Sequence, residues 1–360
     1  MTRSAMANGT IISWGNDDGL PTGTTVGGGV YWDFGGQVSN TPTDTGFTAI
    51  AAGLYHSMAL TSDGSIKSWG YDKHEIDGDT WTSGQVSYTP TDTGFTAIAA
   101  GGYHSLALTS EGSIVSWGEH WETLLHTIPP WTAFQDIAAG YQHSMGLYEY
   151  GGWIESWGKD YFPQVSDTPY DSGFTAIAAG QHHSLALDGN GSIISWGNDW
   201  QGQVSDTPTG NGFTAIAAGA YHSLALTSDG SIVSWGEDYS GVVSDTPTGT
   251  GFQAIAGGWE HSMALDSDGS IISWGNDSKG QVSNTPTGNG FTAIAAGGFH
   301  SMALTAPPPP PEADCLLEGE VEGCGTEDLD ALYAVFNTSV PPTDAVFDLN
   351  SDNVVDAADL

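Results

Sequence analysis

The chain has 360 residues and a formal net charge of −38, from 43 acidic and 5 basic side chains. Nucleic acids and anionic membrane surfaces attract the opposite charge, so this composition disfavours both as partners. No run of about 18 apolar residues is present, and the sequence therefore predicts no transmembrane span.

The N-terminal stretch "MTRSAMANGTIISWG" has no apolar core of signal-peptide length. This predicts either a cytosolic protein or a missing true N-terminus. The first repeat begins almost at once and the C-terminal motif stops midway, so we expect a fragment at both ends. The acidic excess fits an extracellular, calcium-rich or salty setting, where cations screen the self-repulsion. Simple solubility is the alternative explanation.

A repeat runs through most of the chain. His-Ser occurs seven times and Ser-Trp-Gly occurs seven times, and from the third copy of each onward the spacing is 39 or 40 residues. Such a period indicates a solenoid or a propeller. In "AIAAGAYHSLALTSDGSIVSWG", His222 lies beside a serine, as in many catalytic sites. A catalytic site is usually single, so a pair present in every unit favours a structural role, and we expect no catalytic residue.

Each unit reads as a short apolar strand, a β-hairpin and a polar return. "GFTAIAAG" is rich in Ala and Gly, which suits the crowded axis of a radial fold. "HSLALTSDGSIVSWG" predicts a hairpin with Asp229-Gly230 at the centre of a type I′ turn. The third hairpin, "YEYGGWIESWG", is one residue longer, and we expect a β-bulge there.

The ends of the array predict its closure. The chain opens with a lone "GTIISWG", and the array closes with a lone "GFTAIAAGGFHSMALT". Neither is a complete unit, but together they make one. Pairing of the first strand with the last hairpin half closes a ring and removes exposed sheet edges. The predicted fold is therefore all-β, a seven-bladed β-propeller over residues 1–305.

The unit "AIAAGxxHSLALTSDGSIVSWG" followed by "GQV" resembles the repeat of the regulator of chromosome condensation family, over about Gly9 to Thr305. The resemblance implies a seven-bladed β-propeller closed by strand exchange, in which the Gly, His and Trp-Gly positions are mainly architectural. The founding member is an exchange factor for the GTPase Ran and docks on chromatin through basic segments, which this chain lacks. A secreted bacterial relative inhibits β-lactamase through an aromatic-rich propeller face and is the nearest precedent.

Two returns are longer than the others, by 16 residues after Trp14 and by 9 after Trp69. These insertions in adjacent blades could form a lobe that binds a ligand. Variation in loop length without any function is an equally weighted alternative. "DKHEIDGD", Asp72 to Asp79, mixes His with carboxylates, but its spacing fits no standard metal site, so a solvated loop is favoured. The Asp that follows Trp-Gly in six units indicates either a ring of carboxylates or turn chemistry: Asp17, Asp72, Asp160, Asp199, Asp238 and Asp277.

Aromatic residues stand one or two positions before the repeat His in six of the seven units, and Gln181-His182 stands in the seventh. Equivalent positions of a radial fold lie on one face, so they are a candidate ligand face for a protein or a carbohydrate. Packing between blades is the alternative, favoured for the tyrosines and less so for the tryptophan. The residues are Tyr55, Tyr103, Tyr141, Tyr221, Trp259 and Phe299.

Residues 306–312 form a proline-rich linker, in which Pro307 to Pro311 act as a semi-rigid polyproline II spacer. Residues 313–360 resemble a dockerin, which implies a small helical, EF-hand-like calcium module. The loop "DLNSDNVVDAADL" places oxygen ligands at the spacing that calcium requires. These ligands are Asp348, Asn350, Asp352, Val354 through its carbonyl, Asp356 and Asp359.

The upstream half of this module has lost its ligands, and Cys315 and Cys324 bracket that loop. We expect a disulfide between them as a staple in place of the metal, which implies an oxidising, extracytoplasmic location. The helix that should follow Leu360 is absent, so the module is expected to be incomplete.

The sequence thus predicts a secreted or surface-displayed binding protein or scaffold that is not an enzyme. Its propeller face would bind an unknown protein or carbohydrate. Its calcium-loaded tail would bind a cohesin-like partner. One alternative is a polysaccharide-active enzyme that uses the inserted loops, although no acid–base pair or nucleophile stands outside the repeat pattern. The other is a purely structural surface or assembly component.

Overall fold

A computed structural model describes residues 9–17, 35–76, 79–118 and 133–306, with the backbone alone in 73–76 and 79–81. The chain divides into two compact units, Met1–Ala306 and Pro307–Leu360. The linker, the calcium loop and the two cysteines predicted for the second unit lie outside the described residues. The first unit contains all the elements below.

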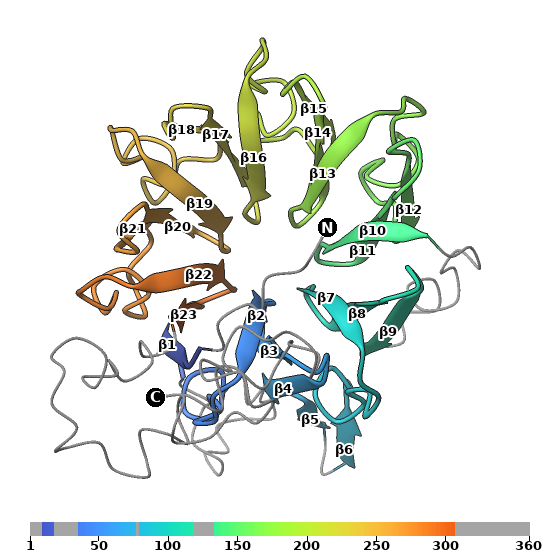
Figure 1. The fold of residues 1–360 in the computed structure, drawn as a ribbon, viewed down its shortest axis with the longest axis vertical. Coiled ribbons are helices and arrows are strands. Elements are labelled where there is room, and N and C mark those ends of the chain that lie inside the picture. Colours follow the sequence, from blue (N-terminus) through green and yellow to red (C-terminus); the bar gives the residue numbers. More distant parts are fainter. Residues whose placement is uncertain (1–8, 18–34, 77–78, 119–132, 307–360) are drawn as a thin grey trace, which may run out of the picture. The chain divides into compact units, whose positions relative to one another are not determined.

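The described strands occupy three equivalent positions, which we call inner, middle and outer according to their distance from the axis of the unit (Figure 1). The inner strands are β2 (Phe47–Ala52), β7 (Phe95–Ala100), β10 (Phe134–Ala139), β13 (Phe174–Ala179), β16 (Phe213–Ala218), β19 (Phe252–Gly257) and β22 (Phe291–Ala296). The middle strands are β3 (His56–Thr61), β8 (His104–Thr109), β11 (His143–Tyr148), β14 (His183–Asp188), β17 (His222–Thr227), β20 (His261–Asp266) and β23 (His300–Thr305). The outer strands are β4 (Ile66–Gly70), β9 (Ile114–Gly118), β12 (Ile154–Gly158), β15 (Ile193–Gly197), β18 (Ile232–Gly236), β21 (Ile271–Gly275) and β1 (Ile11–Gly15).

These strands form seven three-stranded antiparallel sheets within the described residues, and the sheets stand around a common axis (Figure 1). We number them as blades 1 to 7: β2-β3-β4, β7-β8-β9, β10-β11-β12, β13-β14-β15, β16-β17-β18, β19-β20-β21 and β22-β23-β1. A separate hairpin of β5 (Lys73–Ile76) and β6 (Asp79–Thr82) follows blade 1. The described residues contain no helix, so none that could cross a membrane. The all-β propeller predicted from the repeats agrees with this arrangement.

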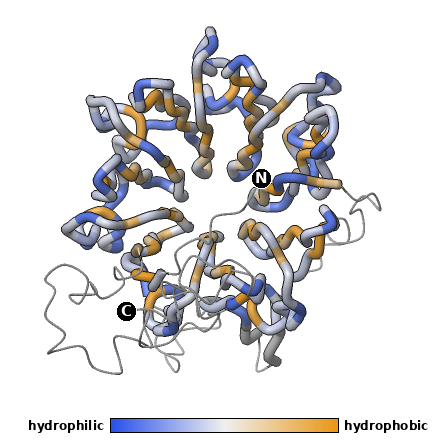
Figure 2. Tube along the Cα trace, viewed as in Figure 1, coloured by the Kyte–Doolittle hydropathy of each residue, from blue (hydrophilic) through white to orange (hydrophobic). Residues whose placement is uncertain are grey.

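The core lies between the blades, because each sheet is covered on both faces by its neighbours. In the middle strand β17, Leu224 packs with Ala264 and Trp274 of blade 6, whereas Ala225 faces Leu185 of blade 4. Large residues thus meet small ones across each interface, which allows close packing. Figure 2 shows apolar segments within every blade. Because both faces of each sheet are covered, the residues of the middle strands are buried almost throughout, although they belong to an antiparallel sheet.

The last blade combines the two ends of the first unit. β1 pairs with β23 from Ile11 opposite Leu304 to Gly15 opposite His300. Ile11 packs in a cluster with Phe47 of blade 1, and Trp14 packs with Met263 of blade 6. The N-terminal strand therefore supplies apolar side chains to both interfaces of blade 7.

The hairpin turns differ from the sequence prediction. A type I′ turn requires positive φ at both central residues, but Gly230 has φ of 78° and Asp229 is not among the positive-φ residues. Gly230 N donates to Thr227 O, and Thr227 N donates to Ser231 O, which defines a longer loop whose glycine is in the left-handed region. The predicted type I′ turn is wrong. The Asp229 carboxylate instead accepts hydrogen bonds from Thr227 and Ser231 within the loop.

The β-bulge predicted for the third hairpin is also wrong. β11 and β12 pair without interruption from His143 opposite Gly158 to Leu147 opposite Ile154. The extra residue lies in the turn, where Gly151 and Gly152 both adopt positive φ. The bulges of the described blades lie between inner and middle strands, as between Phe213 and Ala215.

Candidate functional site

The repeat histidines link each blade to the next. His222 is buried, and its Nε2 lies 2.7 Å from Oγ of Ser262 in the following blade. The other pairs are His56–Ser105, His104–Ser144, His143–Ser184, His183–Ser223, His261–Ser301 and, between blades 7 and 1, His300–Ser57. Each serine that follows a repeat His is thus hydrogen-bonded to the histidine of the preceding blade. These histidines and serines therefore hold the interfaces between blades together.

Burial keeps these histidines neutral. It lowers the pKa of His56, His143, His183 and His261 to about 3, with neighbouring histidines adding to the effect. Burial likewise lowers the pKa of His104, His222 and His300 to about 4. If one of these histidines acted as a general base, its imidazole would take up a proton at a buried site that strongly disfavours the positive charge. The structure therefore agrees with an architectural role for the repeat His.

The glycine three positions before each His is required by close approach. A Cβ added at Gly219 would lie 2.1 Å from Cε1 of His222 and 2.6 Å from the carbonyl oxygen of Gly258 in the next blade. Both distances are far below van der Waals contact. The glycine allows the imidazole and the neighbouring backbone to pack against the same Cα.

The tryptophans form a second set of interblade bonds. Nε1 of Trp235 donates to the carbonyl oxygen of Gln203, in the return that follows the preceding blade, at 3.0 Å. Trp14, Trp69, Trp117, Trp196 and Trp274 make the corresponding bonds. His and Trp-Gly are thus fixed by contacts between blades, as the resemblance implied.

The aspartates that follow Trp-Gly are turn residues. Oδ1 of Asp199 accepts hydrogen bonds from the backbone N–H groups of Val204 and Ser205. Burial raises the pKa of Asp199, but these hydrogen bonds outweigh it and hold the pKa below its usual value. Asp17, Asp72, Asp160, Asp238 and Asp277 accept equivalent bonds. Of the two alternatives left by the sequence, turn chemistry is the one observed, and the described residues hold no group of His, Cys, Asp or Glu placed for a metal ion.

The residues before each His form two concentric rows on one face of the propeller. The inner row, two positions before the His, consists of Leu54, Gly102, Tyr141, Gln181, Ala220, Trp259 and Gly298. The outer row, one position before the His, consists of Tyr55, Tyr103, Gln142, His182, Tyr221, Glu260 and Phe299. The six aromatic residues predicted as a ligand face are thus divided between the rows, and only Tyr141 and Trp259 belong to the inner one.

The aromatic members of both rows contact one another. Ring centroids are 5.3 Å apart for Tyr55–Tyr103 and 5.6 Å apart for Tyr103–Tyr141. Trp259 stacks on Phe299 at 6.1 Å and meets Tyr141 and Tyr221 edge-on at 6.3 Å. All are half-buried, so the packing and the ligand-face alternatives are not exclusive. Each ring packs against a neighbour and retains part of its surface for solvent.

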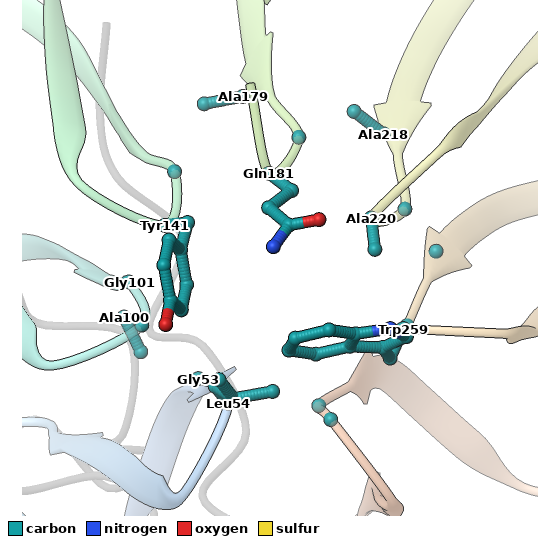
Figure 3. Close-up of a pocket in the computed structure, with 18 of the residues that line it drawn as sticks. Gly53, Leu54, Ala100, Gly101, Tyr141, Ala179, Gln181, Ala218, Ala220 and Trp259 are labelled. Atoms are coloured by element: carbon teal, nitrogen blue, oxygen red, sulfur yellow. The ribbon is translucent and has the colours of Figure 1, made fainter. Parts of the chain in front are cut away.

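The inner row surrounds a cavity on the propeller axis with a volume of about 90 Å³. Its wall is mostly backbone, from the Ala-Gly ends of the seven inner strands. Tyr141, Gln181, Leu54 and Trp259 project into it, with Tyr141 and Trp259 on opposite sides (Figure 3). The repeat places glycine or alanine around the axis, so these larger side chains determine the character of the opening.

Sequence reasoning missed an arc of exposed aromatics in the returns on the same face. Tyr161, Trp200 and Tyr239 occupy the same position in three consecutive units, and their exposed fractions are 64%, 79% and 84%. Phe162 joins this arc to the rows, since its ring lies 4.8 Å from Trp200 and 5.0 Å from His182. Alignment of the returns after Gly-x-Asp would have revealed it. We call the two rows and this arc together the aromatic face.

Two carboxylates on this face were also missed. Glu260 of the outer row accepts a hydrogen bond from Nδ2 of Asn276 at 2.7 Å. Burial raises the pKa of Glu237, and the charge of Glu260 adds to the rise. Burial also raises the pKa of Tyr221, and the charges of both glutamates contribute. The two carboxylates therefore lie beside the Tyr221–Trp259 pair.

The other predicted sites are described only in part. The first insertion, residues 18–34, lies outside the described residues, and the second includes the β5–β6 hairpin. Side chains of "KHEIDGD" fall outside the description, so the cation site considered there is not tested. The same holds for the calcium ligands Asp348 to Asp359 and for Cys315 and Cys324.

The repeats match a known family. The model of the regulator of chromosome condensation (RCC1) repeat matches residues 47–75, 95–120, 174–203, 213–242 and 252–281, each of which begins at an inner strand. Five of the seven units are thus RCC1-type repeats within the β-propeller that the described residues form. A comparison with curated protein sequences finds no match.

Solved structures support the fold of this RCC1-type propeller. Prp20p of Saccharomyces cerevisiae, described with its binding to Gsp1p and histones, is 19% identical with a TM-score of 0.60, and the match covers 93% of this chain and 96% of that one. Yeast RCC1 (Prp20) bound to Kap60 is 19% identical with a TM-score of 0.61, over 93% of each chain. The ectodomain of the Physcomitrella patens receptor kinase CR4 is 20% identical with a TM-score of 0.58, over 70% of this chain and 68% of that one.

Proposed function

We propose that this RCC1-type propeller is a non-enzymatic binding protein or scaffold, and that it holds a protein partner on its aromatic face. The observation that carries the proposal is the exposed arc of Tyr161, Trp200 and Tyr239 in three consecutive units. The repeat fold does not need these residues, because Ser278 stands at the same position after blade 6. Exposed Trp and Tyr residues that continue into a half-buried aromatic cluster are typical of the centre of a protein interface.

Two further features favour binding over chemistry. The repeat histidines and serines are used in interblade bonds, and the turn aspartates are used by backbone N–H groups. Similar propellers bind proteins, since Prp20p binds Gsp1p and histones, and Kap60 binds yeast RCC1. The different returns and row residues of this chain provide its own recognition surface on that common scaffold.

Removal of the arc should strongly reduce partner capture without unfolding the propeller. The variant Tyr161→Ser/Trp200→Ser/Tyr239→Ser loses three exposed rings, and each such anchor typically contributes about 2 kcal/mol or more to binding. We expect quantitative crosslinking in extract and spent medium of the source organism to show a specific partner with the native chain, reduced at least tenfold with the variant.

The matched control is Tyr150→Ser/Trp153→Ser/Tyr170→Ser, which removes three exposed rings near the hairpin turns at the other end of the strands. Equal capture by the native chain and the arc variant contradicts the proposal. A glycan array run in parallel tests the carbohydrate alternative. Turnover of a bound sugar would instead support the enzyme alternative.

We also propose that the pairing of β1 with β23 closes the ring of blades in solution. The ladder from Ile11–Leu304 to Gly15–His300, the His300–Ser57 bond and the contacts of Ile11 and Trp14 with the two adjacent blades support this proposal. A closed ring holds the aromatic rows in a fixed circle, which pre-organises the face for a partner.

We further propose that the tail binds calcium in an extracytoplasmic setting and docks on a cohesin-like partner. The spacing of Asp348, Asn350, Asp352, Asp356 and Asp359 supports calcium binding, and the Cys315–Cys324 pair supports an oxidising location. Isothermal titration of the whole chain with CaCl₂ should show one site that Asp348→Asn/Asp352→Asn removes and Asp171→Asn retains. An unchanged titration with the double variant, or free thiols in native material, contradicts the respective proposal.

A further inference from the structure

We propose that the axial cavity of the aromatic face binds the end of a single lysine or arginine side chain, presented by the protein partner. The inference rests on the proposed function, because it names what the partner inserts at the centre of that face. Its support comes from the size of the cavity, the orientation of its rings and the charge around it.

The size of the cavity selects a side chain rather than a free ligand. Its volume is about 90 Å³, whereas sites for cofactors and drug-sized molecules occupy several hundred Å³. The Ala and Gly backbone of the inner strands prevents enlargement, because Gly219 and its equivalents already contact the next blade. One side-chain terminus therefore fits, and a folded segment does not.

The lining suits a cation. Tyr141 and Trp259 project toward each other across the cavity, with their planes at 83°, and the amide of Gln181 points between them (Figure 3). A cation placed there lies near two π faces, and tryptophan gives the strongest such attraction. Oε1 of Gln181 has no hydrogen-bond partner among the described residues, and a rotation of the amide that exchanges the positions of its nitrogen and oxygen would offer it as an acceptor to an ammonium or guanidinium N–H (Figure 3).

The charge around the cavity favours the same guest. Glu237 and Glu260 lie beside the Tyr221–Trp259 pair, and the whole chain carries −38. No lysine or arginine of the described residues lines the cavity. A cationic group on the partner is therefore drawn to this face over a long range and meets two carboxylates beside the Tyr221–Trp259 pair. An acidic side chain would be repelled.

The probes are pentapeptides Ac-Gly-Gly-X-Gly-Gly-NH₂ with X as Lys, Arg, norleucine or Glu, mixed with the whole chain. Norleucine keeps the length of lysine and removes its charge. Proton NMR of the peptide should show an upfield ring-current shift of the side-chain methylenes for Lys and Arg. We expect norleucine to bind at least tenfold more weakly and Glu to show no shift. Equal affinity of norleucine and lysine overturns the inference.

Variants assign the site. Trp259→Leu removes the π face and keeps an apolar side chain, although a smaller one, and it should weaken the lysine peptide about tenfold, as loss of a cation–π contact requires. Trp259→Phe keeps a ring and should retain part of the binding. Glu237→Gln/Glu260→Gln should weaken binding and reduce its salt dependence, whereas Glu149→Gln, a carboxylate in a hairpin turn, should change neither. Thermal denaturation of each variant checks the fold, and equal binding by Trp259→Leu contradicts the site.

The outcomes separate this inference from the proposed function. Loss of partner capture in the arc variant together with absent peptide binding leaves the binding face and rejects the lysine or arginine guest. Peptide binding without any partner rejects the proposed function and retains the cation site. Failure of both experiments rejects both.

Discussion

Acidification from pH 7 to pH 5 is expected to remove most of the stability of the propeller. The seven repeat histidines are buried and neutral, with pKa values of about 3 to 4 in the folded chain. In the unfolded chain a histidine has a pKa of about 6.5. Between these values the unfolded state binds more protons than the folded state, so stability falls as the pH falls.

The expected loss is large because the histidines are many. Each contributes on the order of 1.4 kcal/mol of destabilisation by pH 5.5, and the seven together about 10 kcal/mol, which is comparable to the whole stability of a typical domain. Turn aspartates such as Asp238 reduce the stability only at lower pH, when they become protonated, since backbone hydrogen bonds hold the pKa of Asp238 below its usual value. The raised pKa of Glu237 gives a small contribution of the opposite sign, because its protonation favours the folded state.

Urea denaturation at pH 7, 6 and 5 measures this dependence, and His222→Gln tests its origin. The variant breaks the bond to Ser262 and should be less stable at pH 7 by about 2 kcal/mol. It cannot take up the proton, so its stability should depend on pH less steeply, by about 1.4 kcal/mol per pH unit. His182 is half-buried and is not one of the seven repeat histidines, so His182→Gln should change the pH dependence of stability less. A stability that stays constant down to pH 4 would show that carboxylates control acid unfolding.

The fold was predictable because the repeat reports the same packing environment seven times. Leu224 and Ala225 alternate in size, and the structure shows that this pattern matches small residues on one blade to large ones on the next. Repetition also identified His222 as structural. It could not identify the serine of the following blade as its partner, because the bond joins residues 40 positions apart.

Local turn chemistry was less predictable. Asp-Gly is the preferred pair for a type I′ turn, but it also suits a longer loop in which only Gly230 needs positive φ. The choice depends on loop length, and Thr227 to Ser231 fixes it through a hydrogen bond that the sequence does not reveal. The additional residue near Trp153 likewise lies in the turn, where two glycines adopt positive φ, and not in a bulge of the strands.

The candidate site was predicted as residue types and not as a surface. The prediction treated residues one and two positions before the His as equivalent. In the structure, a residue two positions before the His, such as Trp259, lines the cavity, whereas a residue one position before it, such as Phe299, belongs to the outer row. The carboxylates Glu237 and Glu260 come from different blades, so only the assembled ring brings them together. The exposed arc was within reach of sequence analysis, because Trp200 and Tyr239 follow the same Gly-x-Asp motif.

Replacement of Trp14 by alanine should destabilise the propeller as much as the equivalent change in a central blade. Trp14 is 5% exposed and donates to the carbonyl of Gln281 at 2.9 Å, and Trp235 is 4% exposed and donates to Gln203 at 3.0 Å. Both indoles fill the interface with the preceding blade. Loss of a buried tryptophan costs about 3–5 kcal/mol. In a closed ring the two positions are equivalent, so Trp14→Ala and Trp235→Ala should lower the free energy of unfolding by the same amount.

The comparison is sensitive because an open array predicts a different result. If β1 were a loose terminal strand, Trp14→Ala would cost little, whereas Trp235→Ala would keep its full cost within a central blade. Urea denaturation of both variants at pH 7 measures the difference, and Ile272→Ala, at an exposed outer-strand residue, controls for the effect of any substitution in an outer strand. Removal of residues 1–15 extends the test, since it exposes the edge of β23 along five paired positions and leaves Gln281 without its indole donor. Retention of native stability by the truncated chain would contradict ring closure, because a closed ring cannot lose an outer strand without exposing both adjacent interfaces.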